Sequence, residues 1–132
     1  MARALERLSA LVFAAAAVSF GCGSPAAPTP RMIVGPIQVD SLEIVRGASS
    51  SSGLGVRVQG VIGDGCTELL PPITQERDGP VVRIGILRQR PEEAICIEIA
   101  KLFDQVVPLM GDYPAGSYVV RVNGAELAFS VP

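Results

Sequence analysis

The feature that most constrains the fold is the last stretch of the chain, from Pro114 to Val131. Asn123-Gly124 stands between two runs of alternating apolar and polar residues, and Asn-Gly readily supplies the φ > 0 pair of a type I′ turn. The apolar face of this hairpin consists of Tyr118, Val120, Val122, Leu127, Phe129 and Val131. Because an isolated hairpin is marginal in water, the sequence predicts a larger sheet and a second layer that covers this face.

The chain before the hairpin contains further short segments with strand patterning, separated by turn residues. The predicted strands cover 37–45, 54–62, 73–77, 82–86, 106–109, 118–122 and 127–131. A bulge is expected near Asp40-Ser41, where the alternation breaks. Pro71-Pro72 is expected to interrupt any central strand, which makes 73–77 an edge strand. The pattern is typical of an all-β protein, an antiparallel β-sandwich of about seven strands.

The segment 91–103 has two conflicting patterns. Pro91 and the two glutamates after it are typical of the start of a helix. Alternating, β-branched residues favour a strand instead, namely Ile95, Ile97 and Ile99. We expect a loop or single turn near Pro91 followed by extended chain through Cys96, and helix remains the alternative.

Residues 1–21 have the composition of an export signal. Arg3 and Arg7 precede an uncharged, mostly apolar run, 8–20, which is shorter than the roughly 20 residues that a membrane-spanning helix needs. The run ends at Gly21-Cys22, which resembles the lipobox of bacterial lipoproteins, where a small residue precedes a lipidated cysteine. The resemblance implies a signal helix over 1–21 and lipidation of Cys22. An ordinary signal peptide with an incidental Cys22 is the alternative.

A flexible tether is predicted at 22–32, followed by one domain at 33–132. The part from Gly23 to Pro30 is rich in proline and cannot pack a core. In a polyproline II conformation it spans about 25 Å, which suits a domain held just clear of a membrane. By resemblance to lipoprotein sorting, Gly23 after the cysteine implies the outer membrane of a host that has one.

The other two cysteines are expected to form a disulfide. If Cys22 carries lipid, Cys66 and Cys96 remain as an even pair, which outside the cytoplasm is usually oxidised. Closing a loop of about 30 residues is worth about 3–4 kcal/mol. A redox or metal role is the alternative, but the chain has no Cys-x-x-Cys and no His to complete a zinc site.

The composition argues against several functions. A chain without histidine lacks Ser-His and Cys-His nucleophile pairs and the commonest metal ligand, so we expect no enzyme, metal or cofactor. A formal charge of −2 gives no basic surface for nucleic acid. The carboxylates that could meet in space are Asp64, Glu68, Asp104 and Asp112, and we expect them to be solvated.

The run from Tyr113 to Val120, with its Pro-Ala-Gly-x-Tyr-x-Val pattern, resembles the start of the penultimate strand in bacterial immunoglobulin-like domains. The resemblance extends over 33–132. It implies an immunoglobulin-like sandwich in the cell envelope, with Tyr118 as a tyrosine corner, and no known activity.

These inferences favour a membrane-tethered, non-catalytic binding or structural module of the bacterial cell envelope. The expected partners are the membrane, through the lipid, and an envelope protein. One alternative is an exported immunoglobulin-like proteinase inhibitor acting through the loops at 47–53 and Pro71-Pro72. A carboxylate-based hydrolase, perhaps glycosidase-like, is a third hypothesis, which a chain of this size without an evident cleft disfavours.

Overall fold

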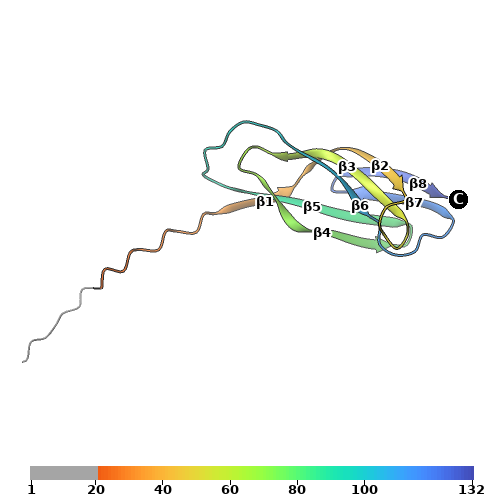
Figure 1. The fold of residues 1–132 in the computed structure, drawn as a ribbon, viewed down its shortest axis with the longest axis horizontal. Coiled ribbons are helices and arrows are strands. Elements are labelled where there is room, and N and C mark those ends of the chain that lie inside the picture. Colours follow the sequence, from red (N-terminus) through yellow and green to blue (C-terminus); the bar gives the residue numbers. More distant parts are fainter. Residues whose placement is uncertain (1–20) are drawn as a thin grey trace, which may run out of the picture.

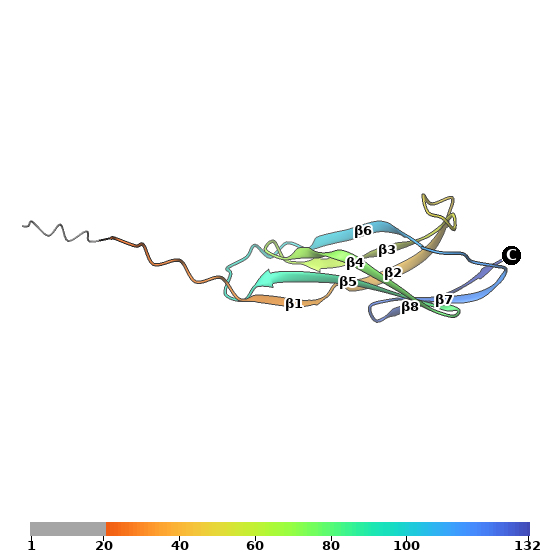
Figure 2. The ribbon, with the colours of Figure 1, turned by 90° about the horizontal axis from the view of Figure 1, so that it is seen from below.

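A computed structural model describes residues 21–132 (Figure 1). The predicted signal helix lies outside these residues. Residues 21–31 form an extended, exposed segment without regular structure, and everything after it folds into two packed β-sheets (Figure 2). Within 21–132, no helix is long and apolar enough to cross a membrane.

Eight strands make up the two sheets. They are β1 (Met32–Pro36), β2 (Gln38–Arg46), β3 (Leu54–Gly63), β4 (Glu68–Asp78), β5 (Val81–Pro91), β6 (Lys101–Pro108), β7 (Gly116–Val122) and β8 (Ala125–Val131). One sheet has the order β2-β3-β6. In the other, β4 lies along one edge of β5, while β1 and β7 share the opposite edge and β8 pairs with β7. The predicted all-β sandwich is therefore confirmed.

Two local irregularities fall where the sequence predicted them. The register of β2 against β3 shifts between Val39 and Ser41, which is the expected bulge. Pro71-Pro72 does not end a strand, because β4 runs through it, but the β4–β5 register shifts between Leu70 and Thr74. Since β4 is an edge strand, the prolines interrupt the ladder without breaking up the sheet.

Three features differ from the sequence-based expectations. The short strand β1 was not predicted. The turn expected near Pro91 is present at 92–93, but the extended chain expected through Cys96 makes no strand pairing, and the alternative helix does not form: 94–100 is irregular and β6 begins at Lys101. The pairing of β5 with β7 is parallel, whereas the other five pairings are antiparallel. After β5 the chain reverses direction into β6, which lies in the other sheet, and reverses again into β7. Because it has reversed twice, β7 runs in the same direction as β5.

The core lies between the sheets and consists mainly of the alternating residues that the sequence singled out. Its buried members are Ile37, Leu54, Val56, Val58, Ile62, Val82, Ile84, Ile86, Phe103, Val107, Leu109, Val120 and Val122. The inward residues of the β7–β8 hairpin belong to this core or pack against it, so the apolar face of the hairpin is covered as predicted.

The turn between β7 and β8 is not of type I′. Asn123 has φ 52, in the left-handed region, but Gly124 lies outside that region. The type I′ prediction, which needs φ > 0 at both positions, is therefore wrong. Asn123 is held by its side chain, which bonds to the neighbouring strands rather than to its own turn.

Candidate functional site

Cys22 lies in the extended segment, is exposed, and is the one cysteine not in a disulfide. All residues from 21 to 34 are exposed. The segment enters the domain beside the end of β5, where Met32 pairs with Pro91 and the amide of Glu92 donates to the carbonyl of Arg31 at 2.9 Å. Cys22 therefore lies nine positions before Arg31, the first residue that bonds to the domain, and all of this stretch is exposed to solvent. We call residues 22–31 the lead segment.

Cys66 and Cys96 are joined by a disulfide with a Cα–Cα separation of 5.5 Å. Neither cysteine is in a strand: Cys66 lies in the turn 63–67 after β3, and Cys96 lies in the connection 92–100 between β5 and β6. We call this connection the isoleucine loop. The loop lies at the end of the domain that the extended segment enters, and both views agree on this (Figures 1 and 2).

Further polar contacts hold the isoleucine loop against the turn 63–67. Arg90, in β5, makes an ion pair with Asp64 at 2.9 Å and donates to the Cys96 Sγ atom at 3.4 Å. The amide of Gly65 donates to the Ile97 carbonyl at 3.0 Å. The disulfide, the arginine and this backbone bond together fix the position of the loop at its middle.

Asp64 caps the turn. Its Oδ1 atom accepts hydrogen bonds from the Thr67 hydroxyl at 2.7 Å and from the Cys66 amide at 3.1 Å. The Thr67 bond is the main cause that lowers the pKa of Asp64, and Arg90 adds to the effect. A carboxylate held in its ionised form by such partners is a hydrogen-bond acceptor in the fold and is poorly suited to be a general acid.

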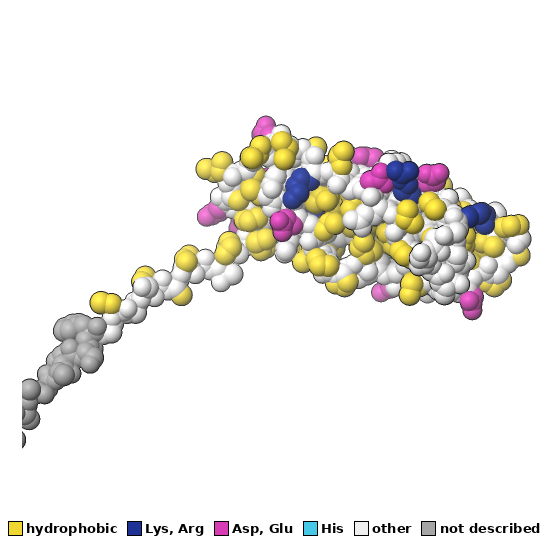
Figure 3. Space-filling model, viewed as in Figure 1, with side chains coloured by type: hydrophobic (Ala, Val, Ile, Leu, Met, Phe, Trp, Pro, Cys, Tyr) yellow, Lys and Arg dark blue, Asp and Glu magenta, His cyan; other side chains and the backbone are white. Residues whose placement is uncertain are grey.

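The isoleucines of the loop point into solvent. The exposed fractions are 103% for Ile95, 73% for Ile97 and 54% for Ile99. Figure 3 shows hydrophobic side chains on the surface of this end of the domain, with acidic side chains among them. Scattered exposed apolar residues are normal, but three on one short, stapled loop form a small apolar patch.

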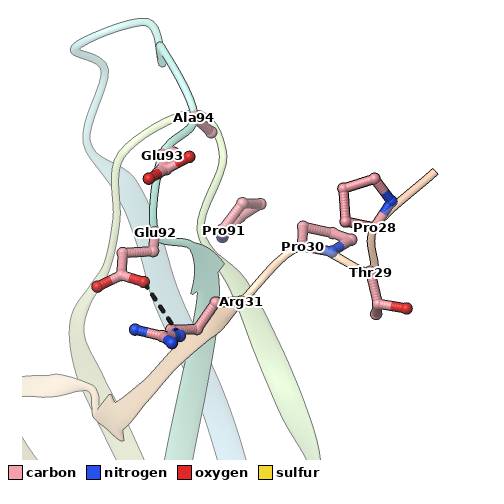
Figure 4. A pocket seen from close by; sticks show the side chains of 8 residues that line it. All are labelled: Pro28, Thr29, Pro30, Arg31, Pro91, Glu92, Glu93 and Ala94. Carbon is pink, nitrogen blue, oxygen red and sulfur yellow. Dashed lines mark ion pairs between the residues drawn. The ribbon is translucent and has the colours of Figure 1, made fainter.

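A hollow of about 690 Å³ separates the lead segment from the isoleucine loop. It is lined by Pro28–Arg31 on one side and Pro91–Ala94 on the other (Figure 4). Arg31 and Glu92 bridge it with an ion pair of 3.5 Å, the interaction marked in the figure. Because the Arg31 side chain is 83% exposed, this pair contributes little stability. The hollow therefore lies where the lead segment meets the domain.

The remaining candidate residues lie in the C-terminal hairpin, where Tyr118 and Asn123 have structural roles and Gly124 has none. The Tyr118 hydroxyl donates to the Pro114 carbonyl at 2.6 Å, closing the chain as a tyrosine corner does. Asn123 Nδ2 donates to the carbonyls of Ile37 and Ile86, and its Oδ1 atom accepts from the Ile86 amide. Gly124 is exposed with open space around it.

The four carboxylates that the sequence singled out are not brought together by a common partner. Asp104 binds Arg57 through two hydrogen bonds of 2.7 and 2.8 Å, which lower its pKa to about 2. Asp64 binds Arg90, and Glu68 and Asp112 are exposed. Among residues 21–132 no group of three or more acidic or cysteine side chains has the arrangement of a metal site.

A family model described as the ORF11 beta-sandwich domain matches residues 56–131, which is more than half of the chain. The chain belongs to the ORF11 beta-sandwich domain family. It is also similar to an "Uncharacterized 10.2 kDa protein in HgiCIIM 5'region" from Herpetosiphon aurantiacus, with 26% identity over 95 residues. That alignment covers 72% of this chain and all of the relative. No solved structure matches the chain.

The ORF11 beta-sandwich match runs from β3 to β8 and so includes both cysteines of the disulfide, the isoleucine loop and the C-terminal hairpin. It supports the sandwich and names no activity. Cys22 and the lead segment lie before the matched region.

Sequence reasoning missed the exposure of the isoleucines in this ORF11 beta-sandwich domain, because their alternation has the period of a half-buried strand. One signal pointed the other way. Cys96 lies in the middle of the alternating segment, and its partner Cys66 follows the turn residues Gly63-Asp64-Gly65. A bond to a turn holds the segment at the end of the sandwich, away from any strand edge.

Proposed function

We propose that this protein is an extracytoplasmic lipoprotein of the bacterial cell envelope, in which the ORF11 beta-sandwich domain is a non-catalytic binding or structural module. The observation that carries the proposal is Cys22, exposed at the start of an extended, proline-rich lead that enters a disulfide-bonded domain. The signal peptide over 1–21 and the outer membrane location belong to the same proposal.

The cysteines support an oxidising compartment. A disulfide between Cys66 and Cys96 is the usual state of such a pair outside the cytoplasm and is rare inside it. This pairing leaves Cys22 as the odd cysteine, and lipidation gives that cysteine a role.

The non-catalytic role is supported by what the charged groups do. Asp64 and Asp104 have lowered pKa values because they bind arginine, threonine and amide donors that also hold the fold together. The domain shares a tyrosine corner with immunoglobulin-like sandwiches, although its parallel β5–β7 pairing departs from their antiparallel sheets. The partners proposed are the membrane and an envelope protein, without nucleic acid or cofactor.

The test is the intact mass of the protein extracted from its native membrane, with and without reduction before alkylation. We expect a chain that begins at Cys22 with added acyl mass, and two thiols that are alkylated only after reduction. The matched variant Cys22→Ser should move the protein from the membrane fraction to the soluble fraction with its disulfide intact. A chain cut elsewhere, or one that stays in the membrane as Cys22→Ser, would refute the anchor.

The inhibitor alternative is tested separately, by titrating a panel of proteases. The loop 47–53 is closed by the Gly47 amide, which donates to the Gly53 carbonyl at 2.8 Å, and is held to the chain after β6 by the Ser52 hydroxyl, which donates to the Leu109 carbonyl at 2.7 Å. Pro71-Pro72 lies within β4. Neither segment is a long free loop. Inhibition at stoichiometric concentration would replace the proposed binding role.

A further inference from the structure

We propose that the isoleucine loop, 92–100, is a membrane-contact element that inserts Ile95, Ile97 and Ile99 into the interfacial region of a lipid bilayer. The inference rests on the proposed function, because the lipid on Cys22 is what brings the loop to a membrane. It goes beyond that function by assigning a second contact between protein and lipid and by fixing which end of the domain faces the bilayer.

The position of the loop is the first argument. The lead segment meets the domain at the backbone bond between Arg31 and Glu92, and Glu92 is the first residue of the isoleucine loop. Arg31 is nine positions after Cys22, and at roughly 3.1 Å per residue in a polyproline II conformation this distance is about 28 Å. A lipid on Cys22 therefore confines the loop to a thin layer of solvent next to the membrane surface.

The chemistry of the exposed side chains is the second argument. Ile95 has no burial at all, and Ile97 and Ile99 are more than half exposed. The free energy falls when these branched, apolar side chains move from water to the boundary between headgroups and acyl chains. One such contact alone is weak, but a tether makes it intramolecular and so raises the local concentration of lipid around it.

The rigidity of the loop is the third argument. The Cys66–Cys96 disulfide, the Arg90 contact with Cys96 and the Gly65–Ile97 backbone bond hold the loop at its middle. A loop held in this way keeps its apolar side chains outward instead of folding them onto the domain, and it loses little conformational entropy on contact.

The charges near the loop predict which lipids the loop can bind. Glu92, Glu93 and Glu98 are exposed on the loop itself, and Arg31 is already paired with Glu92. A negative balance of this kind gives no attraction to anionic headgroups. Binding should therefore occur on zwitterionic phosphatidylcholine, which has no net charge, and should gain nothing from added anionic lipid.

The test uses tryptophan fluorescence, because the chain has no tryptophan of its own. Ile95→Trp places a reporter at a fully exposed position, and Met110→Trp places a matched reporter on a 62% exposed residue after the far end of β6. Each full-length, acylated protein is reconstituted into phosphatidylcholine vesicles with brominated acyl chains, and disulfide formation is checked to show that the domain has folded.

We expect a blue-shifted emission and roughly threefold stronger bromine quenching for the reporter at 95 than for the one at 110, because only the former reaches the acyl region. Adding Ile97→Ser and Ile99→Ser to the 95 reporter should remove most of the difference. Equal quenching at 95 and 110 would overturn the inference. So would a blue shift that appears in native membranes but not in protein-free vesicles, since it would indicate a protein partner.

The anchor and the loop can fail separately. If the mass shows no acyl chain on Cys22, the proposed function fails, and the soluble protein is mixed with a large excess of the same brominated vesicles. Stronger quenching at 95 than at 110 would then still support the loop contact. Its absence would refute the loop contact as well.

Discussion

At the scale of single residues, Asn123 shows how one side chain can fix the relation between distant strands. It bonds to the carbonyl of Ile37, between β1 and β2, and to both backbone groups of Ile86 in β5. Its own amide donates to the Ile84 carbonyl at 3.1 Å, just where the parallel β5–β7 ladder ends. Asn123 thus satisfies the Ile37 carbonyl and the Ile86 amide at the edge that β1 and β7 share, whereas the Ile86 carbonyl also accepts from the Ile37 amide at 3.1 Å.

We predict that Asn123→Ala destabilises the protein by about 2–4 kcal/mol, because it leaves partly buried backbone groups without a hydrogen-bond partner and puts alanine at positive φ. The measurement is the free energy of unfolding in denaturant. Asn123→Gly is the matched control, since glycine accepts the same backbone conformation. If Asn123→Gly were as stable as the natural protein, the side-chain bonds would not matter.

Asp104 makes the stability of the folded protein depend on pH. Its hydrogen bonds with Arg57, and then with Gln59, lower its pKa from 3.8 to about 2. The stabilisation by this pair is therefore complete above pH 3.8 and is lost as the pH falls through about 2.

Asp104→Asn should lower the free energy of unfolding at neutral pH by a small amount, since both partners are about half exposed. Below about pH 2 the variant and the natural protein should converge, because both then carry a neutral side chain. An NMR titration of the Asp104 carboxyl gives its pKa directly. A midpoint at 3.8 would show that Arg57 does not hold the carboxylate in solution.

At the scale of elements, the contact of β2 with β3 depends on Gly60. Gly60 is buried and pairs with Val39, next to the bulge at Asp40. A Cβ atom built on Gly60 would overlap the Gln38 carbonyl oxygen, well inside van der Waals contact, and this neighbour is backbone. The bulge brings the two strands so close that only glycine fits.

Gly60→Ala should therefore destabilise the protein by about 3 kcal/mol or more, because backbone must move to make room. Gly35→Ala is the matched control: Gly35 also lies in a strand, but nothing lies within 4 Å of its added Cβ. We expect that control to stay within about 0.5 kcal/mol of the natural protein in denaturant unfolding. Equal effects of the two substitutions would refute the close approach of β2.

At the scale of the whole molecule, the sandwich has two ends with different properties. One end receives the lead segment and carries the stapled turn 63–67 and the isoleucine loop (Figure 1). The other carries the turn 47–53 and the chain from Leu109 to Tyr113, where Arg77 stacks on the Tyr113 ring at 4.3 Å. Within residues 21–132 the disulfide is the only covalent cross-link, and Cys22 is the cysteine outside it.

We predict that replacing Cys66 and Cys96 together by serine lowers the stability by about 3–4 kcal/mol, because the unfolded chain gains the freedom of a loop of about 30 residues. Denaturant unfolding of the variant, and of the natural protein under reducing conditions, should agree. Cys22→Ser is the control and should leave the unfolding transition unchanged, since Cys22 is exposed in the lead. An unchanged transition in the double variant would contradict the stabilising role of the disulfide.

Local sequence patterns correctly predicted the class of fold, seven of the eight strand positions at least in part, the bulge near Asp40 and the core face of the C-terminal hairpin. These features depend on local periodicity and on residues such as proline, which act over a few neighbours. The same local pattern is misleading at 95–99, where the alternation resembles a strand but the Cys66–Cys96 disulfide holds the segment against the turn after β3.

The contacts between elements could not be predicted in this way and are known from the folded structure alone. The parallel β5–β7 pairing, the Asn123 bonds to Ile37 and Ile86, and the exposure of the isoleucine loop all join residues far apart in the chain. No local propensity encodes such relations, because they depend on which edge remains open once the sheets have packed. The surface proposed to contact lipid also depends on tertiary structure. Its three isoleucines have the alternation of strand residues in the sequence, but they are exposed because their loop lies at the end of the domain that the lead segment enters (Figure 1).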